Sequence, residues 1–367
     1  MHNAHVPAPI ADEDFLVASH VAAAAANAEQ ACRELNDSSP ALANLEALAR
    51  QLLRAESVAS SRIEGLILSH RRLAKAAFSE DGRDLTATSV LANIAALECA
   101  VLLTGESDRF AREDLLEIHR TLFVGTRDEQ LGGVLREEQN WIGGAASSPR
   151  DAEFVPPPYE LVPELLDDLC AFASRDDIPA VIQAAIAHAQ FETIHPFLDG
   201  NGRVGRALIL GILRRRRLAP RYLPPVSLAL AGEADRYVTG LTSWRNGDEE
   251  DGYTVFVDSV SRASTAGRAF ADHLAELRDH WAREAGNPRR NSGPLRLIEL
   301  LPSQPIVDVK TAARLLGGTE ERARQTILRL ENAGVVGQTS VGRRNRAWES
   351  VGLFELLDRF ERDLGPA

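Results

Sequence analysis

The stretch HPFLDGNGRVGR at residues 195–206 brings together residue types that can act on a nucleotide. Its Gly-Asn-Gly segment tolerates the positive φ angles of a tight loop, and apolar residues resume at helical spacing from Val204. A glycine-rich loop that leads into a helix points backbone N–H groups at an anion, and the helix dipole adds partial positive charge. Arg203 and Arg206 flank this loop and can donate hydrogen bonds to phosphate oxygens. The stretch therefore predicts a phosphate-binding site.

His195 and Asp199 add proton transfer and metal binding to that site. Pro196 disfavours helical geometry at His195, so we expect the preceding helix to end there. The imidazole could accept a proton from an attacking hydroxyl group, and Asp199 offers an oxygen ligand for the Mg²⁺ that accompanies nucleotide phosphates. The combination indicates phosphoryl or nucleotidyl transfer. Lys75 and Lys310, the only lysines, do not belong to a Walker A loop, so arginine and backbone must hold the phosphates.

A zinc site is the rival interpretation of the same region. His188, Glu192 and His195 recur at i, i+4 and i+7 on one helix face, from which they could ligate zinc. No fourth ligand is evident, and no HExxH motif occurs. We therefore expect His188 to form a hydrogen bond within the core instead.

The composition limits the class of protein. The 367 residues carry a net charge of −12, which argues against nucleic-acid binding over the whole chain. No apolar run reaches the roughly 20 residues of a membrane span, and the first residues lack the pattern of a signal peptide. Cys32, Cys99 and Cys170 lack metal-ligand spacing and are expected to be buried thiols in a reducing compartment. We expect a cytoplasmic protein without a membrane partner.

Periodicity and turn signals predict a mostly α-helical chain. Helices are expected at residues 12–35, 42–53, 86–103, 112–123, 161–173 and 179–193. Ser39-Pro40 is expected to cap the second of them. Residues 132–158 indicate a hairpin or an extended flap, because three consecutive prolines prevent a central strand. Residues 285–294, which contain Gly, Pro and Asn, form the best candidate for a linker.

The residues after this linker predict a winged helix-turn-helix. The expected order is a helix at 295–301, a strand at 306–309, a helix at 310–316, a helix capped by Thr319, and a hairpin with a basic turn. Ala323, Ile327 and Leu330 line one face of the capped helix, and Gly334 takes the C′ position after it.

The sequence resembles the Fic-domain family. HPFLDGNGRVGR agrees with the signature HxFx(D/E)GNGRxxR at every specified position. AHAQFETIHPF resembles the helix that precedes the signature, and NWIGG…FVPPP resembles the flap that binds target proteins. SSRIEG at residues 60–65 is similar to the inhibitory pattern (S/T)xxxE(G/N). The resemblance covers residues 42–260, and a winged helix is a common C-terminal companion of such domains.

The resemblance implies a Fic-type helical bundle with a β-hairpin flap, followed by a C-terminal winged helix-turn-helix domain. The implied divisions are an N-terminal helical region with the inhibitory helix at 1–85, a catalytic domain at 86–284, the linker at 285–294, and the winged helix at 295–367.

The resemblance also implies the activity of a protein adenylyltransferase. Such an enzyme moves AMP from ATP to Ser, Thr or Tyr hydroxyl groups of target proteins, or of itself, and releases pyrophosphate. His195 would be the general base, Asp199 would hold Mg²⁺, and Tyr237 would lie near the adenine. The implied nucleotide-binding residues are Gly200, Asn201, Gly202, Arg203, Val204, Gly205 and Arg206. Gly202 is present where kinase-like members carry lysine, and removal of AMP from targets stays open.

The inhibitory pattern implies a specific contact. Glu64 would form a salt bridge with Arg206 and so occupy the guanidinium that should hold the γ-phosphate, with Ser60 as the other specified residue of the pattern. The flap at 134–157 would bind an extended target segment by strand addition, and a homodimer is possible.

A nucleotide-sensing DNA-binding regulator is the alternative function. Residues 290–349 contain ten basic and six acidic residues, and Arg343, Arg344 and Arg346 crowd the expected wing turn, where phosphate contacts are often made. Winged helices also serve as protein-interaction or dimer modules, so this alternative stays open. The sequence does not identify a target protein.

Overall fold

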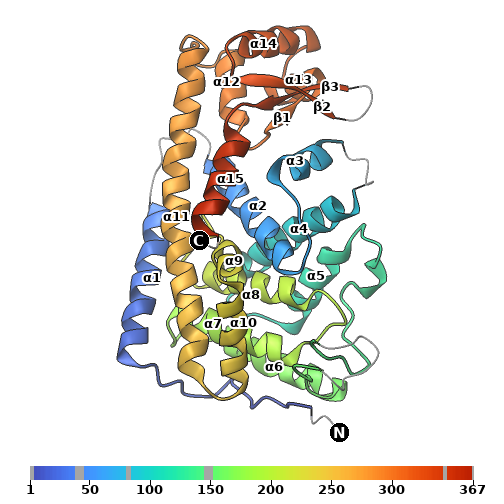
Figure 1. Ribbon diagram of the computed structural model, residues 1–367, viewed down its shortest axis with the longest axis vertical. Coiled ribbons are helices and arrows are strands. Elements are labelled where there is room, and N and C mark those ends of the chain that lie inside the picture. The colour runs from blue at the N-terminus through green and yellow to red at the C-terminus, as the bar shows by residue number, and fades with distance from the viewer. Residues whose placement is uncertain (1–3, 38–44, 80–83, 144–151, 342–344, 366–367) are drawn as a thin grey trace.

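The computed structural model describes residues 4–37, 45–79, 84–143, 152–341 and 345–365, and within these ranges the fold is mostly helical (Figure 1). Its elements in chain order are α1 (Ser19–Asp37), α2 (Leu45–Ile63), α3 (His70–Ser79), α4 (Leu85–Glu106), α5 (Arg112–Phe123), η1 (Glu129–Leu131), η3 (Tyr159–Leu161), α6 (Val162–Ala173), α7 (Ala180–Ile194), α8 (Asn201–Arg215), α9 (Val226–Gly232), α10 (Ala234–Arg245), α11 (Glu249–Glu284), α12 (Gly293–Leu300), β1 (Ile306–Val307), α13 (Val309–Leu316), α14 (Glu320–Asn332), β2 (Val336–Val341), β3 (Asn345–Ser350) and α15 (Leu353–Leu364). The predicted mostly α fold class is confirmed.

The central element is the pair α7 and α8, which pack against each other and are surrounded by α4, α5, α6, α10 and α11 (Figure 1). Every residue of α7 is buried, so its sequence lacks the polar face of a surface helix. Most of α8 is buried as well. The loop that joins them, which contains His195, is therefore held by core elements on both sides.

Most helices agree with the sequence prediction. The segments expected at 86–103, 112–123, 161–173 and 179–193 correspond to α4, α5, α6 and α7. The second helix, α2, begins within the expected range, whereas Ser39-Pro40 lies outside the described residues. α15 was not predicted, although its buried side chains recur at helical spacing.

The first helix begins later than predicted, at Ser19 rather than residue 12. The backbone N–H groups of Ile10 and Ala11 donate to the Asp168 carboxylate at 2.7 and 3.1 Å. Arg175 Nη1 also donates to the carbonyl oxygens of Ala11 and Glu13 at 3.1 and 2.7 Å, so these backbone groups bond to segments far away in sequence instead of to a helix of their own. Local propensity could not predict this contact.

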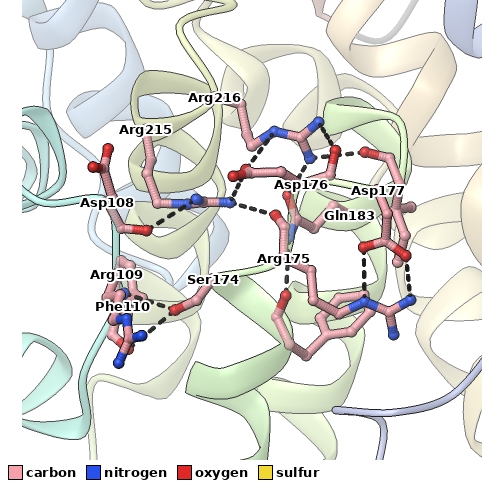
Figure 2. A network of polar contacts seen from close by, with 12 residues as sticks. Asp108, Arg109, Phe110, Ser174, Arg175, Asp176, Asp177, Gln183, Arg215 and Arg216 are labelled. Carbon is pink, nitrogen blue, oxygen red and sulfur yellow. Dashed lines mark hydrogen bonds and ion pairs between the residues drawn. The ribbon is translucent and has the colours of Figure 1, made fainter.

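A charged network anchors the C-terminal end of α8 to the surrounding loops (Figure 2). Arg215 donates to the carbonyl oxygens of Asp108 at 3.1 Å and Arg175 at 2.5 Å. Arg216 donates to the carbonyl oxygen of Asp176 at 3.0 Å and also lies 3.2 Å from its carboxylate. Positive charge at this end of a helix complements the helix dipole. The network fixes the end of α8 that is opposite to the predicted phosphate loop.

Gly205 allows α7 and α8 to approach closely. A Cβ atom at this position would lie 2.6 Å from Glu192 Oε1 and 3.0 Å from His188 Nδ1, both on buried side chains. We expect Gly205→Ala to lower the free energy of unfolding by about 1–3 kcal/mol through overpacking. Chemical denaturation measures this change. Gly318→Ala is the control, because nothing lies within 4 Å of its added methyl group; equal effects of the two changes would contradict the packing argument.

The C-terminal elements follow the order expected of a winged helix. β1, β3 and β2 form an antiparallel sheet in that spatial order, with Val307 opposite Trp348 and Val336 opposite Ser350. Thr319 caps α14 by accepting from the Arg322 N–H. The predicted apolar face of α14 is buried, and it consists of Ala323, Ile327 and Leu330.

The basic turn of the hairpin is only partly described. Arg343 and Arg344 lie outside the described residues. Arg346 lies over the Trp348 ring at 5.0 Å and its Nη2 is 3.8 Å from Glu331 Oε1. DNA binding by this module therefore stays a prediction.

The predicted linker does not separate two independent cores. α11 ends at Glu284 and α12 begins at Gly293, close to the expected boundaries. However, one hydrophobic cluster joins Leu48 and Leu52 of α2 and Trp281 of α11 to residues of α12–α15. The division into domains stays a prediction, and α15 packs against α11, α9 and α3 in the body of the molecule (Figure 1).

Among the described helices, one is long and apolar enough to cross a membrane by length and composition alone. It is the segment Leu85–Gly105 of α4, with a mean hydropathy of 1.7 over its most apolar window. In this fold α4 packs against α2, α5 and α8.

Candidate active site

His195 lies at the C-cap of α7, as the sequence predicts. Its backbone takes the left-handed conformation with φ 49° and ψ 62°, while its N–H still donates to Phe191 O at 2.9 Å. A non-glycine residue rarely adopts this conformation, and such outliers gather at functional sites. The turn directs the chain from α7 into the loop that leads to α8.

Arg136 holds this turn and was not predicted from the sequence. The side chain is 2% exposed. It donates from Nε to His195 O at 2.9 Å, from Nη2 to Pro157 O at 2.6 Å, and from Nη1 to Glu138 O at 3.2 Å. The Arg136 guanidinium therefore connects both ends of the flap to His195, the residue expected to act as the general base. A single arginine within the flap region carries no sequence signal for this role.

His119 of α5 supports the loop from the other side and was also missed. Its ring stacks on Phe197 with centroids 3.6 Å apart. Gly133 N–H donates to His119 Nδ1 at 2.9 Å, so Nε2 carries the proton and donates to Asp199 O at 3.0 Å. Burial lowers the pKa of His119 to about 4, which keeps this tautomer neutral.

The predicted glycine-rich loop leads directly into α8. Gly200 has φ 81°, and a Cβ there would lie 2.9 Å from the Phe123 ring. The Asn201 side chain accepts from Phe197 N–H at 2.9 Å and donates to Phe197 O at 2.8 Å. Both polar ends of the Asn201 side chain therefore close the loop on itself. Val204 is fully buried.

A carboxylate occupies the predicted phosphate site. Glu64 lies in the turn after α2, and its Oε1 is 2.8 Å from Arg206 Nη2. A Cβ on Gly202 would lie only 2.0 Å from the same oxygen, so the carboxylate rests on the first turn of α8. The predicted pair between Glu64 and Arg206 is confirmed as a contact, and an acidic group is the expected occupant of a helix N-terminus.

Arg206 is enclosed by the end of α2. It is 1% exposed, and it donates from Nε to Ser60 Oγ and from Nη2 to Ser60 O, both at 2.9 Å. Burial disfavours its charge, but the Glu64 carboxylate raises the pKa of Arg206 above its ordinary value. Burial likewise disfavours the charge of Glu64, and Arg206 still holds the pKa of Glu64 below its ordinary value. The pair is therefore ionised at neutral pH.

Asp199 and Arg203 border an adjacent cavity of about 240 Å³. The Asp199 carboxylate is 57% exposed, and its Oδ2 lies 3.4 Å from Arg203 Nη2. Besides Asp199, Arg203 and Glu64, the cavity is lined by Leu66, Leu85, Thr88, Ser89, Phe123, Thr126, Arg127 and Asp128. Asp199 and Asp128 are exposed carboxylates on this cavity, which fits Mg²⁺, because that ion usually keeps several waters and binds through one or two carboxylates and the substrate phosphates.

The His195 imidazole is neutral at physiological pH. Burial lowers its pKa to about 4, and the nearby charges of Arg245 and Arg136 act in the same direction. Its Nδ1 lies 3.8 Å from Oε2 of Glu192, a buried carboxyl whose pKa burial raises to about 7. A neutral imidazole can accept a proton, which is the state a general base requires.

This pKa predicts the pH dependence of transfer. We expect kcat/KM to fall on the acidic side only as pH approaches about 4, because His195 is protonated below its lowered pKa. A free histidine would place that limb near pH 6.5. Rates of the Glu64→Gly protein measured from about pH 4 to pH 7 test this expectation, and an acidic limb centred near 6.5 would contradict the neutral, buried base.

The zinc arrangement does not form, because His188 belongs to the core. Its Nε2 lies 2.8 Å from Tyr237 Oη, and both side chains are buried. Among the described residues, no group of three or more His, Cys, Asp and Glu could hold a metal ion. The expectation of a core hydrogen bond for His188 is confirmed. Tyr237 is 5% exposed and is the partner of His188, and its expected place near the adenine stays a prediction.

The flap is described in part. Ile142 pairs with Phe154 in an antiparallel bridge, and residues 144–151 between them lie outside the described residues. The edge next to Phe154 is not free, because His5 N–H donates to Val155 O at 2.9 Å. On this edge an extended target would have to displace the N-terminal segment, and strand addition to the flap stays a prediction.

Two family models match this chain, and their ranges include the residues of the candidate site. Residues 109–213 match the model of the Fic/DOC family, and residues 22–102 match the model of the Fic/DOC family N-terminal region, so that together they span about half of the chain. The chain belongs to the Fic/DOC family. Glu64 lies in the N-terminal match, and the phosphate loop lies in the Fic match, so the contact between them joins the two matched regions.

Named relatives of this Fic protein include adenylyltransferases. The protein adenylyltransferase fic-1 of Caenorhabditis elegans is 34% identical over 131 residues, which are 35% of this chain and 24% of that protein. A probable protein adenylyltransferase of Aquifex aeolicus (strain VF5) is 35% identical over 112 residues, which are 30% of this chain and 31% of that protein. The chain thus spans about a quarter to a third of the length of these curated relatives.

A solved structure has the same fold over nearly the whole chain. The crystal structure of a Fic family protein from Desulfovibrio desulfuricans G20 superposes with a TM-score of 0.51 at 21% identity. The match covers 92% of this chain and 98% of that chain. At this identity the likeness establishes the fold alone.

Proposed function

We propose that the protein is an adenylyltransferase that moves AMP from ATP to hydroxyl groups of proteins and that Glu64 holds it in an inhibited state. The observation that carries the proposal is the Glu64 carboxylate on the first turn of α8, 2.8 Å from Arg206. It indicates an anion site formed by backbone N–H groups and arginine, next to a neutral His195. The names of the relatives support the identity of the transferred group.

In this mechanism the residues of the chain bind, orient and accept a proton. Because His195 Nδ1 faces Glu192, Nε2 is left to accept the proton of the target hydroxyl. The hydroxyl oxygen then forms a bond to the α-phosphorus, and the bond from that phosphorus to the bridging oxygen breaks to release pyrophosphate. The first turn of α8 and Arg203 and Arg206 stabilise the developing negative charge. Mg²⁺, when held by Asp199, would neutralise part of the phosphate charge.

Inhibition follows from the occupied anion site. A phosphate oxygen and the Glu64 carboxylate would require the same donors on Arg206, so the nucleotide must displace a partly buried, hydrogen-bonded ion pair before it can bind productively. Breaking such a pair costs several kcal/mol when one charge is left unpaired. The same carboxylate could also orient water for the reverse reaction, in which AMP is removed from a target.

The test identifies which phosphate is transferred. The Glu64→Gly protein is incubated with Mg²⁺ and ATP labelled at either the α- or the γ-phosphate, and the protein is analysed by intact mass. Adenylyl transfer leaves the α-label and one adenylyl group on protein, whereas a kinase would leave the γ-label. Absence of the α-label from both the Glu64→Gly protein and added proteins would overturn the proposal.

A further inference from the structure

The C-terminal module, which comprises residues 293–365, forms ion pairs with both ends of the segment that carries Glu64. Glu361 of α15 lies with its Oε2 at 2.9 Å from Arg62 Nη2 and its Oε1 at 3.1 Å from His70 Nε2. Arg62 is in the last turn of α2, two residues before Glu64, and His70 is the first residue of α3. A single carboxylate therefore contacts both sides of the turn that positions Glu64.

A second contact secures the start of α3 to the same module. Arg71 lies 3.2 Å from Glu349 of β3 and 2.8 Å from Glu355 of α15, and its guanidinium lies over the Phe354 ring. These partners all belong to the C-terminal module, so both ends of the turn are tied to it.

The turn between these anchors is short and has its own local structure. Gly65 takes φ 80°, and Leu66 N–H donates to Ser61 O at 2.9 Å, which closes the end of α2. Leu68 is buried, whereas Ile67 is exposed. Because only six residues separate α2 from α3, a shift of either helix end moves the Glu64 carboxylate relative to α8.

Glu361 itself is held more firmly than a surface carboxylate. Its side chain is 13% exposed, and His70 is 3% exposed. Arg62, which is 38% exposed, donates charge-assisted hydrogen bonds to Glu361 at 2.9 and 3.1 Å, and such partly buried bonds are stronger than fully exposed ion pairs, whose contribution is small. Six apolar residues of α15 fix the helix independently, namely Leu353, Phe354, Leu356, Leu357, Phe360 and Leu364.

We propose that Glu361 is a positioning residue that keeps Glu64 in the anion site, so that the C-terminal module controls access of ATP. The inference rests on the proposed inhibitory role of Glu64. A ligand or partner that moves α15 would loosen the turn through Arg62 and His70 and would free Arg206 for phosphate. The coupling joins the C-terminal module to the anion site of the same chain. Binding at either site would shift the position of the turn at residues 64–69.

The test is the Glu361→Gln protein, which keeps the shape of the side chain and removes its charge. We expect its affinity for a fluorescent ATP analogue in Mg²⁺ to rise about tenfold, the change that corresponds to losing one charge-assisted hydrogen bond. Asp358→Asn is the matched control, because it makes the same charge change on the exposed face of α15 and should leave the affinity unchanged.

A second measurement separates positioning from general loosening of the fold. In the Glu64→Gly background, Glu361→Gln should add nothing to nucleotide affinity, because the carboxylate that it positions is gone. Arg62→Gln removes the other half of the ion pair and should raise the affinity for nucleotide as Glu361→Gln does. It replaces Glu361→Gln in the test if the Glu361→Gln protein folds poorly.

The outcomes distinguish this inference from the proposed function. Unchanged affinity in both Glu361→Gln and Arg62→Gln, or an equal further gain in the Glu64→Gly background, would overturn the inference. A gain in nucleotide affinity that behaves as expected, but without transfer of AMP by the Glu64→Gly protein, would leave the coupling intact and overturn the proposed activity.

Discussion

Replacing His195 by alanine in the Glu64→Gly protein is expected to lower the rate of AMP transfer by about 10²–10⁴-fold, the typical contribution of a general base. The physical reason is that His195 acts on the incoming hydroxyl group and not on the nucleotide. The relieved background is needed because the native site is occupied by Glu64, which would hide a further loss. Transfer is measured from the early rate of label incorporation from α-labelled ATP.

Nucleotide binding is the control for this change. Affinity for ATP should stay within about twofold of the parent, since the anion site is formed by α8, Arg203 and Arg206. The backbone at His195 is left-handed, so His195→Asn, which tolerates that conformation, separates loss of the imidazole from strain in the turn. Near-normal transfer by either variant would exclude His195 as the base.

Replacing Glu64 by glycine is expected to raise AMP incorporation about 10- to 100-fold. Removal of the carboxylate frees Arg206 and the first turn of α8 for phosphate, and the strength of a buried, hydrogen-bonded ion pair sets the size of the gain. Self-modification of the protein should rise together with modification of added proteins. The rates are compared under saturating Mg²⁺ and ATP.

Two further variants test the cause of that gain. Glu64→Gln keeps the size of the side chain and removes its charge, so its activity should lie between those of the native protein and Glu64→Gly. Arg206→Ala should lose activity with either residue at position 64, because the phosphate contact itself is gone. Unchanged or lower incorporation by Glu64→Gly would show that the Glu64 carboxylate does not limit nucleotide binding.

The local sequence pattern was sufficient to predict most of the helices and the tight loop before α8. Pro196 marked the end of α7, Gly200 and Gly202 marked the tight loop, and helical spacing from Val204 marked α8, because each of these signals depends on backbone sterics of neighbouring residues. The pattern did not reveal the late start of α1, whose preceding backbone groups bond to Asp168. It also missed α15.

Roles that depend on distant partners were less accessible from the sequence. Tyr237 lies in the core, where its hydroxyl group contacts His188, so its expected place near the adenine stays a prediction. Arg136 and His119 carry no motif, and their importance comes from donors and acceptors that other segments present to them. A buried polar group must find a partner wherever the fold supplies one, and that requirement has no fixed spacing in the chain.

The sequence by itself determined a mostly α-helical chain and a tight loop that leads into a helix within residues 195–206, for which it predicted phosphate binding. The pairing of Glu64 with Arg206 followed from the family resemblance rather than from local physics. Only the tertiary structure decided that the carboxylate rests on the first turn of α8 and that Glu361 grips both ends of its turn. The reason is that local signals act over a few residues, whereas these ion pairs form between segments that only the packing of α2, α8 and α15 brings within hydrogen-bonding distance.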